Sequence, residues 1–165
     1  MTPLVVLVGP PGAGKSTVGR LLAHRRGVAF RDTDEDVVAA AGESISDIFV
    51  GRGEAAFRQL EREAVRVALT DHDGVLALGG GSVLDDSTRK LLGEQQVVFL
   101  DVGVGEAASR VGFNRDRPLL LGNPRAQLRT LLEQRRPLYL EVATVTVETD
   151  GKSSAEVVDA VEAAL

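Results

Sequence analysis

Short apolar runs alternate with longer amphipathic segments along the whole chain. The runs are rich in Val and Leu and have the length of strands that are buried on both faces. The longer segments repeat their apolar positions every three or four residues, which is typical of helices with one face in a core. Strands are predicted at Leu4–Val8, Val28–Arg31, Val75–Leu78, Val97–Val102 and Thr144–Val147.

Helices are expected between these strands and after the last one. Strands that are separated by helices favour the α/β class, with a parallel sheet covered by helices on both faces. In such sheets ligands bind beyond the carboxyl ends of the strands, so the polar residues that follow each strand are expected to carry the chemistry. The helices are predicted at Lys15–Arg26, Asp34–Ala41, Ser44–Val50, Glu54–Thr70, Asp86–Leu92, Gly105–Val111, Arg125–Glu141 and Ser153–Leu165.

The first predicted strand leads into a phosphate-binding loop. The segment Gly9–Thr17 reads GPPGAGKST and fits the pattern G-x-x-x-x-G-K-[ST]. Its glycines let backbone N–H groups surround an anion, and the helix that follows adds the positive end of its dipole. A tight turn that binds nothing is the alternative, and the flanking strand and helix argue against it. The residues expected to hold nucleotide phosphates are Gly12, Ala13, Gly14, Lys15, Ser16 and Thr17, with Lys15 on the β- and γ-phosphates and Ser16 on Mg²⁺.

Two carboxylates follow the second strand. Asp32 and Asp34 flank Thr33, and in an extended chain their side chains share one face. One carboxylate is suited to a Mg²⁺-bound water and the other to a substrate hydroxyl. The alternative is that Asp34 only caps the next helix while Asp32 lies in the turn.

Three glycines follow the third strand. Gly79, Gly80 and Gly81 cost conformational entropy on folding unless the backbone must come close to another group. We therefore interpret them as a backbone platform for a ligand, with an ordinary glycine turn as the alternative.

The helix at 54–70 carries an arginine and a glutamate three residues apart. Its buried stripe is predicted to be Phe57, Leu60, Ala64 and Val67, with Arg58 and Glu61 on a neighbouring face. The residues alone favour a surface ion pair worth a few tenths of a kcal/mol. The two histidines, at 24 and 72, stand in polar surroundings and are expected at the surface.

The segment Gly112–Gly122 is predicted to be a mobile lid. It carries Arg115 and Arg117 between glycines, so it is suited to bring an arginine onto a transferring phosphate. A solvated charged loop is the alternative.

Composition narrows the function classes. The chain has 165 residues, 44% of them hydrophobic and 26% charged, which fits one globular domain. It has no cysteine, which excludes disulfides, zinc–thiolate sites and thiol catalysis. The net charge of −5 argues against general attraction to nucleic acid. No signal peptide or membrane-spanning run is apparent, so a cytoplasmic location is expected, and we expect a monomer because no amphipathic element lacks a place in the fold.

These segments together resemble the shikimate kinase family, which belongs to the nucleoside-monophosphate-kinase-like group of P-loop proteins. The P-loop alone indicates only the superfamily, whereas the ordered set of motifs is much more specific. The resemblance covers nearly the whole chain. It rests on GPPGAGKST at Gly9–Thr17, DTD at Asp32–Asp34, Ile48-Phe49 with Phe57-Arg58-x-x-Glu61, GGGSV at Gly79–Val83, RPLL at Arg117–Leu120 and R-x-P-L-Y at Arg135–Tyr139.

The resemblance implies a fold and an activity. The fold is a three-layer α-β-α P-loop kinase fold with a five-stranded parallel sheet and a mobile lid. It implies one domain over residues 1–165, with the lid at about 112–122 and an acceptor-binding helical region at about 34–61. The activity is Mg²⁺-dependent transfer of the ATP γ-phosphoryl group to the 3-hydroxyl of shikimate, in aromatic amino acid biosynthesis.

The resemblance also implies roles for single residues on the acceptor side. Arg58 and Arg135 would clamp the shikimate carboxylate, with Glu61 orienting Arg58. Asp34 would bind ring hydroxyls and is a candidate base, and Gly79–Gly81 would offer backbone groups. Arg136 is adjacent to Arg135, but the apolar stripe of this helix at Leu128, Leu131 and Leu132 favours Arg135 as the residue that faces inward.

Further implied roles concern the nucleotide. Lys15 and Arg117 would stabilise charge on the γ-phosphoryl group. Ser16 would ligate Mg²⁺, and Asp32 would act on it through water. Arg110 and the loop Asp150–Ser153, with Lys152 as the contact residue, would line the adenine.

Two other functions remain as alternatives. The first is a related small-molecule kinase, such as a gluconate or nucleoside-monophosphate kinase. The second is a non-catalytic ATP-binding sensor of the same fold. Lys15, Ser16, Asp32 and Arg117 together argue against the sensor, because each has a role in phosphoryl transfer.

Overall fold

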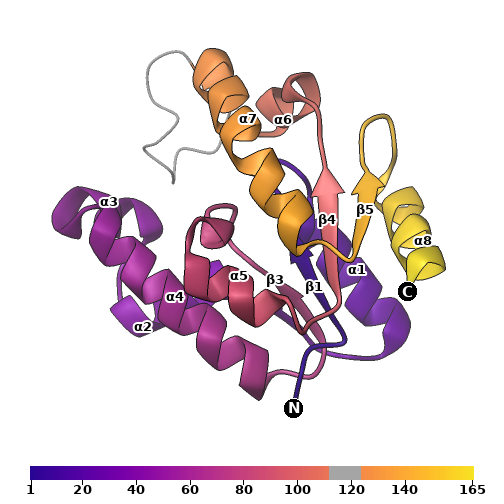
Figure 1. Cartoon of the computed structure of the whole chain (residues 1–165), viewed down its shortest axis with the longest axis horizontal. Coiled ribbons are helices and arrows are strands. Elements are labelled where there is room, and N and C mark those ends of the chain that lie inside the picture. Colours follow the sequence, from indigo (N-terminus) through magenta and orange to yellow (C-terminus); the bar gives the residue numbers. More distant parts are fainter. Residues whose placement is uncertain (112–123) are drawn as a thin grey trace.

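A parallel sheet forms the centre of the molecule. The computed structural model describes residues 1–111 and 124–165 and places five strands in the order β2-β3-β1-β4-β5, every pair of them parallel (Figure 1). The α/β class and the five-stranded parallel sheet are thus confirmed. The strands are β1 (Val5–Val8), β2 (Phe30–Asp32), β3 (Val75–Ala77), β4 (Val97–Asp101) and β5 (Val145–Glu148).

Helices cover both faces of the sheet, which gives the predicted three layers (Figure 1). Every predicted strand and helix is present, and each of its ends lies within two residues of the predicted one. A short 3₁₀ helix, η1 (Ser82–Leu84), was not predicted. The helices are α1 (Lys15–Arg26), α2 (Thr33–Ala41), α3 (Ile45–Arg52), α4 (Glu54–Asp71), α5 (Asp86–Leu92), α6 (Val104–Val111), α7 (Pro124–Val142) and α8 (Ser154–Ala164).

The central strand divides its side chains between two cores. Successive residues of a strand point to opposite faces. Val5 and Leu7 therefore pack with α1 and α8 on one face, whereas Val6 and Val8 pack with α4 on the other. All four side chains are almost fully buried. Burial on both faces explains why this strand reads as a continuous apolar run.

A third, smaller cluster joins α2, α3 and α4 beside the β2 edge of the sheet. Its buried residues are Val37, Ile48 and Phe57, one from each helix. This is the region that the sequence assigned to the acceptor.

The buried face of α4 differs from the predicted stripe. Apart from Phe57, the fully buried positions are Glu61, Val65, Ala68 and Leu69, whereas Leu60, Ala64 and Val67 are only partly buried. The prediction followed hydrophobicity alone, and it therefore could not include a buried glutamate.

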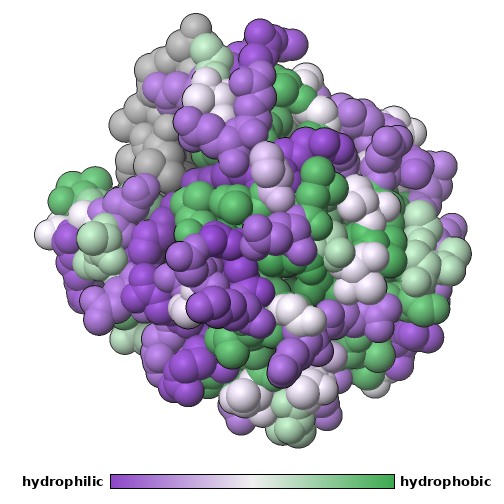
Figure 2. Space-filling model, in the orientation of Figure 1, coloured by the Kyte–Doolittle hydropathy of each residue, from purple (hydrophilic) through white to green (hydrophobic). Residues whose placement is uncertain are grey.

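Polar residues predominate on the face shown in Figure 2, where hydrophobic residues form separate smaller areas. In the described parts of the chain, no helix has the length and apolar character needed to cross a membrane. His24 is exposed as expected, but the expectation for His72 is wrong. His72 is 8% exposed, and its Nε2 atom is hydrogen-bonded to the Val75 carbonyl oxygen at 3.0 Å.

Candidate active site

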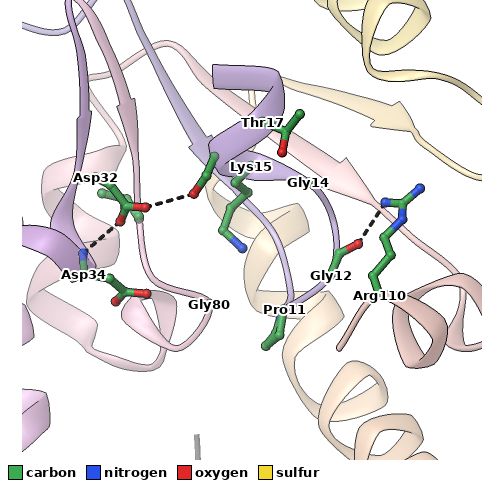
Figure 3. A pocket seen from close by; sticks show the side chains of 11 residues that line it. Pro11, Gly12, Gly14, Lys15, Thr17, Asp32, Asp34, Gly80 and Arg110 are labelled. Atoms are coloured by element: carbon green, nitrogen blue, oxygen red, sulfur yellow. Dashed lines mark hydrogen bonds between the residues drawn. The ribbon is translucent and has the colours of Figure 1, made fainter. Parts of the chain in front are cut away.

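A pocket of about 400 Å³ opens at the carboxyl ends of β1, β2 and β3, where the sequence placed the chemistry (Figure 3). The P-loop forms one side of the pocket, the end of β2 another, and α6 contributes one arginine. The lining residues are Pro11, Gly12, Gly14, Lys15, Ser16, Thr17, Asp32, Asp34, Leu78, Gly80 and Arg110.

The P-loop leaves the start of α1 open to a ligand. Gly12 and Gly14 have φ values of 84° and 90°, a left-handed conformation that residues with side chains rarely adopt. Gly14 is the N-cap of α1, and no side chain caps this helix end. The N–H groups at this end of the helix and the helix dipole therefore face the pocket, an arrangement suited to an anion.

Two members of the loop differ in what they can offer. Lys15 donates from Nζ to the carbonyl oxygens of Gly9 and Pro10, at 2.7 and 3.0 Å, so its ammonium group lies against the loop beside the pocket. Ala13 is only 1% exposed and packs in the core, and its N–H donates to the Pro10 carbonyl oxygen at 3.2 Å. The side chain of Ala13 thus anchors the loop in the hydrophobic core.

Asp32 connects the P-loop helix with α2. Its Oδ2 accepts from the Ser16 hydroxyl at 2.9 Å, and its Oδ1 accepts from the Asp34 N–H at 2.9 Å. Asp32 is therefore the N-cap of α2, and the alternative in which Asp34 caps this helix is wrong. The Asp34 side chain lines the pocket instead.

The environment of Asp32 raises the pKa of its carboxyl group. Burial is the largest cause, and the negative charge of Asp34 adds to it. The hydrogen bonds from the Asp34 N–H and the Ser16 hydroxyl act in the opposite direction. A cation bound nearby would favour the ionised carboxylate.

Ser16 and Asp32 are suited to a magnesium ion. Both present oxygen atoms, which Mg²⁺ prefers, and these two oxygens lie 2.9 Å apart at the edge of the phosphate-binding loop. Within residues 1–111 and 124–165, no group of three or more His, Cys, Asp or Glu side chains is placed to hold a metal ion. A magnesium ion at this position would thus depend on phosphate oxygens and water for its remaining ligands.

Arg58 and Glu61 form a buried ion pair rather than a surface pair. Arg58 Nη1 donates to Glu61 Oε1 at 2.8 Å, and the side chains are 16% and 3% exposed. The interpretation drawn from the residues alone is therefore wrong, because α4 turns Glu61 toward the sheet. Arg58 and Gly81 line a second pocket of about 250 Å³ next to the first.

Two of the three glycines, Gly79 and Gly81, are needed for space. A Cβ atom on Gly79 would lie 2.6 Å from Asp34 Oδ1 and 2.7 Å from Glu61 Oε2. A side chain on Gly81 would overlap the guanidinium group of Arg58. The loop is therefore in close contact with the predicted acceptor-binding side chains, as an ordinary turn would not be.

The two adjacent arginines of α7 point in different directions. Arg135 is 7% exposed, whereas the Arg136 side chain is 54% exposed and donates to Asp101 Oδ2 at 2.9 Å. This hydrogen bond raises the pKa of Arg136. The helix continues through Pro137, and Leu128 and Leu132 are buried, so the predicted inward direction of Arg135 is confirmed.

Arg110 and the loop after β5 are joined on the other side of the P-loop. Arg110 donates from Nη1 to the Gly12 carbonyl oxygen at 2.8 Å (Figure 3) and from Nη2 to Glu106 Oε2 at 2.9 Å. Glu106 Oε1 in turn accepts from the Gly151 N–H at 2.7 Å. Sequence reasoning missed Glu106, although its spacing of four residues from Arg110 is typical of a helical ion pair. Lys152 is exposed and does not line the pocket.

Part of the predicted site lies outside the described residues. This applies to the lid at 112–122 and to Arg117, the arginine expected on the γ-phosphoryl group. Both stay predictions.

Comparisons with known proteins agree with this geometry. The family model described as shikimate kinase matches residues 11–165. A shikimate kinase of Streptomyces coelicolor is 61% identical over 158 residues, which cover 96% of this chain and 92% of the relative. The chain belongs to the shikimate kinase family.

Two solved structures allow a comparison of this chain with a shikimate kinase and with a gluconokinase. The structure of a shikimate kinase from Acinetobacter baumannii in complex with shikimate has a TM-score of 0.94 and 37% identity, and the match covers 98% of this chain and 92% of that one. A gluconokinase from Sinorhizobium meliloti has a TM-score of 0.57 and 26% identity over 99% of this chain and 91% of that one. The chain thus resembles the shikimate kinase far more closely than the gluconokinase.

Proposed function

We propose that this chain transfers the γ-phosphoryl group of ATP to the 3-hydroxyl of shikimate. The observation that carries the proposal is that Asp34, Arg58 and the glycine loop meet at the carboxyl ends of the strands, where the P-loop also lies. A phosphate donor and a small hydroxy acid can therefore bind side by side. Family membership supports the same reaction.

The phosphate donor is held by charge and by backbone N–H groups. The open N-terminus of α1 binds the phosphates, and Lys15 moves from the loop carbonyl groups onto the β- and γ-phosphates. Because such a transfer needs little covalent help from the protein, positioning and charge stabilisation supply most of the catalysis.

Ser16 and Asp32 provide the magnesium site in this proposal. A bound Mg²⁺ would supply positive charge that offsets the negative charge developing on the phosphates during transfer. The Ser16 hydroxyl would ligate the ion and Asp32 would orient one of its waters, which is consistent with the 2.9 Å contact between the two side chains.

The acceptor carboxylate is bound by Arg58 and Arg135. Glu61 occupies Arg58 Nη1 and orients the guanidinium group. Arg58 Nη2 is buried, lies 4.0 Å from Glu54 Oε1 and makes no hydrogen bond within the described parts of the chain. A buried donor of this kind needs a partner, and a carboxylate oxygen supplies one. Arg135 approaches from α7, on its buried face.

Asp34 binds the acceptor hydroxyl that reacts. Its carboxylate lies against Gly79 and lines the phosphate pocket, so it can accept the hydroxyl proton as the oxygen attacks the γ-phosphorus.

The segment 112–122 closes over both substrates as a lid and brings Arg117 to the γ-phosphoryl group. Arg110, Glu106 and the loop at 150–153 bind the adenine side of ATP. The chain acts as a monomer of one domain, and a cytoplasmic location fits its use of ATP.

A comparison of acceptors tests the proposal. ADP release is measured with ATP and Mg²⁺ and, in turn, shikimate, gluconate, AMP or no acceptor. Rapid release with shikimate alone is expected. Turnover of gluconate or AMP at the rate of shikimate would assign the chain a different acceptor, and ATP binding without any turnover would indicate a sensor.

A further inference from the structure

Two buried hydroxyl groups hold the loop of three glycines. Tyr139 donates from its hydroxyl to the Gly80 carbonyl oxygen at 2.6 Å, and the Gly79 N–H donates to Thr33 Oγ1 at 3.2 Å. Tyr139 is 1% exposed and Thr33 is fully buried. Bulk water therefore cannot replace either bond if the hydroxyl is removed.

Tyr139 determines the direction of the peptide between Gly80 and Gly81. The chain contains no cis peptide bond in its described parts, and in a trans peptide the carbonyl and the N–H point in opposite directions. Because the Gly80 carbonyl is directed at Tyr139, the Gly81 N–H points away from it. Gly81 lies against the Arg58 guanidinium group, and its N–H makes no hydrogen bond within residues 1–111 and 124–165. This N–H and Arg58 can thus meet the same anion.

Thr33 ties the other end of the loop to α2. It lies between Asp32 and Asp34, and its hydroxyl accepts the Gly79 N–H while Asp34 rests against Gly79. The bond therefore sets how far the Asp34 carboxylate stands from the glycine loop.

The core fixes Tyr139 itself. Its ring stacks on Phe99, with ring centroids 5.0 Å apart and an angle of 28° between the planes. Arg135 precedes it by four residues, about one turn, so both side chains lie on the same buried face of α7. One helix thus delivers an arginine and supports the loop next to it.

We propose that Tyr139 and Thr33 are positioning residues for the acceptor. Tyr139 turns the Gly81 N–H toward the carboxylate that Arg58 binds, and Thr33 sets the spacing between the loop and Asp34. The inference rests on the proposed function, because it takes the acceptor to be a hydroxy acid bound at this loop.

Substitutions that remove only the hydroxyl groups test the inference. Tyr139→Phe keeps the stacked ring, and Thr33→Val keeps the branched shape. Each is expected to raise the KM and Kd for shikimate about tenfold or more, because a buried backbone group loses its hydrogen bond and the loop that contacts the acceptor is no longer held in place. The Kd for an ATP analogue should change by less than about threefold, which is well below the roughly tenfold change expected for shikimate. Thr33→Ser, which restores the hydroxyl, should recover most of the loss.

His72→Phe is the matched control. It also removes a hydrogen bond from a buried ring to a backbone carbonyl, but at the amino end of β3, away from the pocket. It should lower Tm and leave the KM for shikimate unchanged. If Tyr139→Phe and Thr33→Val also lower only Tm, or if Thr33→Ser is as impaired as Thr33→Val, the inference is wrong. Failure of the unaltered chain to phosphorylate shikimate would instead refute the proposed function.

Discussion

At the scale of single residues, the site depends on charged groups whose surroundings give each a different task. Asp32 and Asp34 are separated by one residue, yet one caps a helix and contacts Ser16 while the other lines the pocket. Arg135 and Arg136 are adjacent, yet one is buried and the other pairs with Asp101 near the surface. Residue type alone would not have separated the members of either pair.

Replacement of Arg58 by alanine should weaken shikimate far more than ATP. The loss of one charge-assisted contact costs on the order of 1.5–3 kcal/mol, so Kd for shikimate should rise between about tenfold and more than a hundredfold. Arg66→Ala is the control, because Arg66 lies on the same helix but pairs with Glu63 in an exposed position. Isothermal titration of each substrate checks this, and equal losses for ATP and shikimate would indicate a structural role for the Arg58–Glu61 pair.

The adjacent arginines of α7 should give unequal results. Arg135→Ala should raise Kd for shikimate about tenfold or more, since a buried contact to a carboxylate is lost. Arg136→Ala removes an exposed pair with Asp101, which contributes at most about 1 kcal/mol, so binding should be nearly unchanged. Titration of both variants decides the matter, and the reverse order would mean that Arg136 binds the acceptor.

The raised pKa of Asp32 predicts a dependence on pH. Without ligands, the folded chain holds this proton to higher pH than the unfolded chain does. The contribution of Asp32 to stability therefore falls as pH rises from the ordinary aspartate pKa to the raised one, and it stays unfavourable above that. Asp32→Asn removes the charge and keeps an oxygen for the Asp34 N–H, so its Tm near neutral pH should equal or exceed that of the unaltered chain.

The same substitution should impair the use of Mg²⁺. The Mg²⁺ concentration for half-maximal activity is expected to rise about tenfold or more, because an outer ligand that orients a metal-bound water is lost. In the unaltered chain, the Mg²⁺ concentration for half-maximal activity should rise as the pH falls through the raised pKa of Asp32. An unchanged Mg²⁺ requirement in the variant would contradict the assignment of Asp32.

At the scale of elements, the sequence predicted the order and type of strands and helices because each apolar run has the period of its element. It failed on α4, where a buried Glu61 stands among apolar positions and is paired with Arg58. Periodicity cannot show such a residue, since it records hydrophobicity and not the partner that makes burial possible. The same applies to the support of the glycine loop by Tyr139 and Thr33, which come from distant elements.

Glu106 tests the link between elements at the nucleotide end. It joins Arg110 of α6 to the loop after β5 through contacts at both carboxylate oxygens. Glu106→Gln keeps the shape but has one accepting oxygen in place of two, so one hydrogen bond is lost and the other is no longer charge-assisted. The Kd for an ATP analogue should therefore rise about threefold to tenfold, as for loss of about 1 kcal/mol. Shikimate binding measured alone should not change. Equal weakening of both ligands would show that α6 has a more general structural role.

At the scale of the whole molecule, parallel strands bring residues from distant parts of the sequence to one edge. β1 ends at the P-loop, β2 at Asp32 and β3 beside the glycine loop, and the three strands are neighbours in the order β2-β3-β1. This rule allowed the site to be located from the sequence, because the P-loop, the segment Asp32–Asp34 and the glycine loop each follow a strand. The direction of Arg135 followed from the helical period, but the directions of Asp34 and Glu61 could not be predicted, since they depend on packing between elements.

The central claim is that one edge of this sheet holds ATP and shikimate together and transfers phosphate between them. The most direct measurement is ³¹P nuclear magnetic resonance of the chain with ATP, Mg²⁺ and shikimate, with Lys15→Ala as the control. We expect one new phosphate monoester, coupled to the proton at ring carbon 3, that accumulates together with ADP. The control should form it at least about a hundredfold more slowly, since a cation on the transferring phosphate is lost, while its Tm is retained. Phosphate on another hydroxyl, free phosphate alone, or an equally active Lys15→Ala variant would contradict the claim.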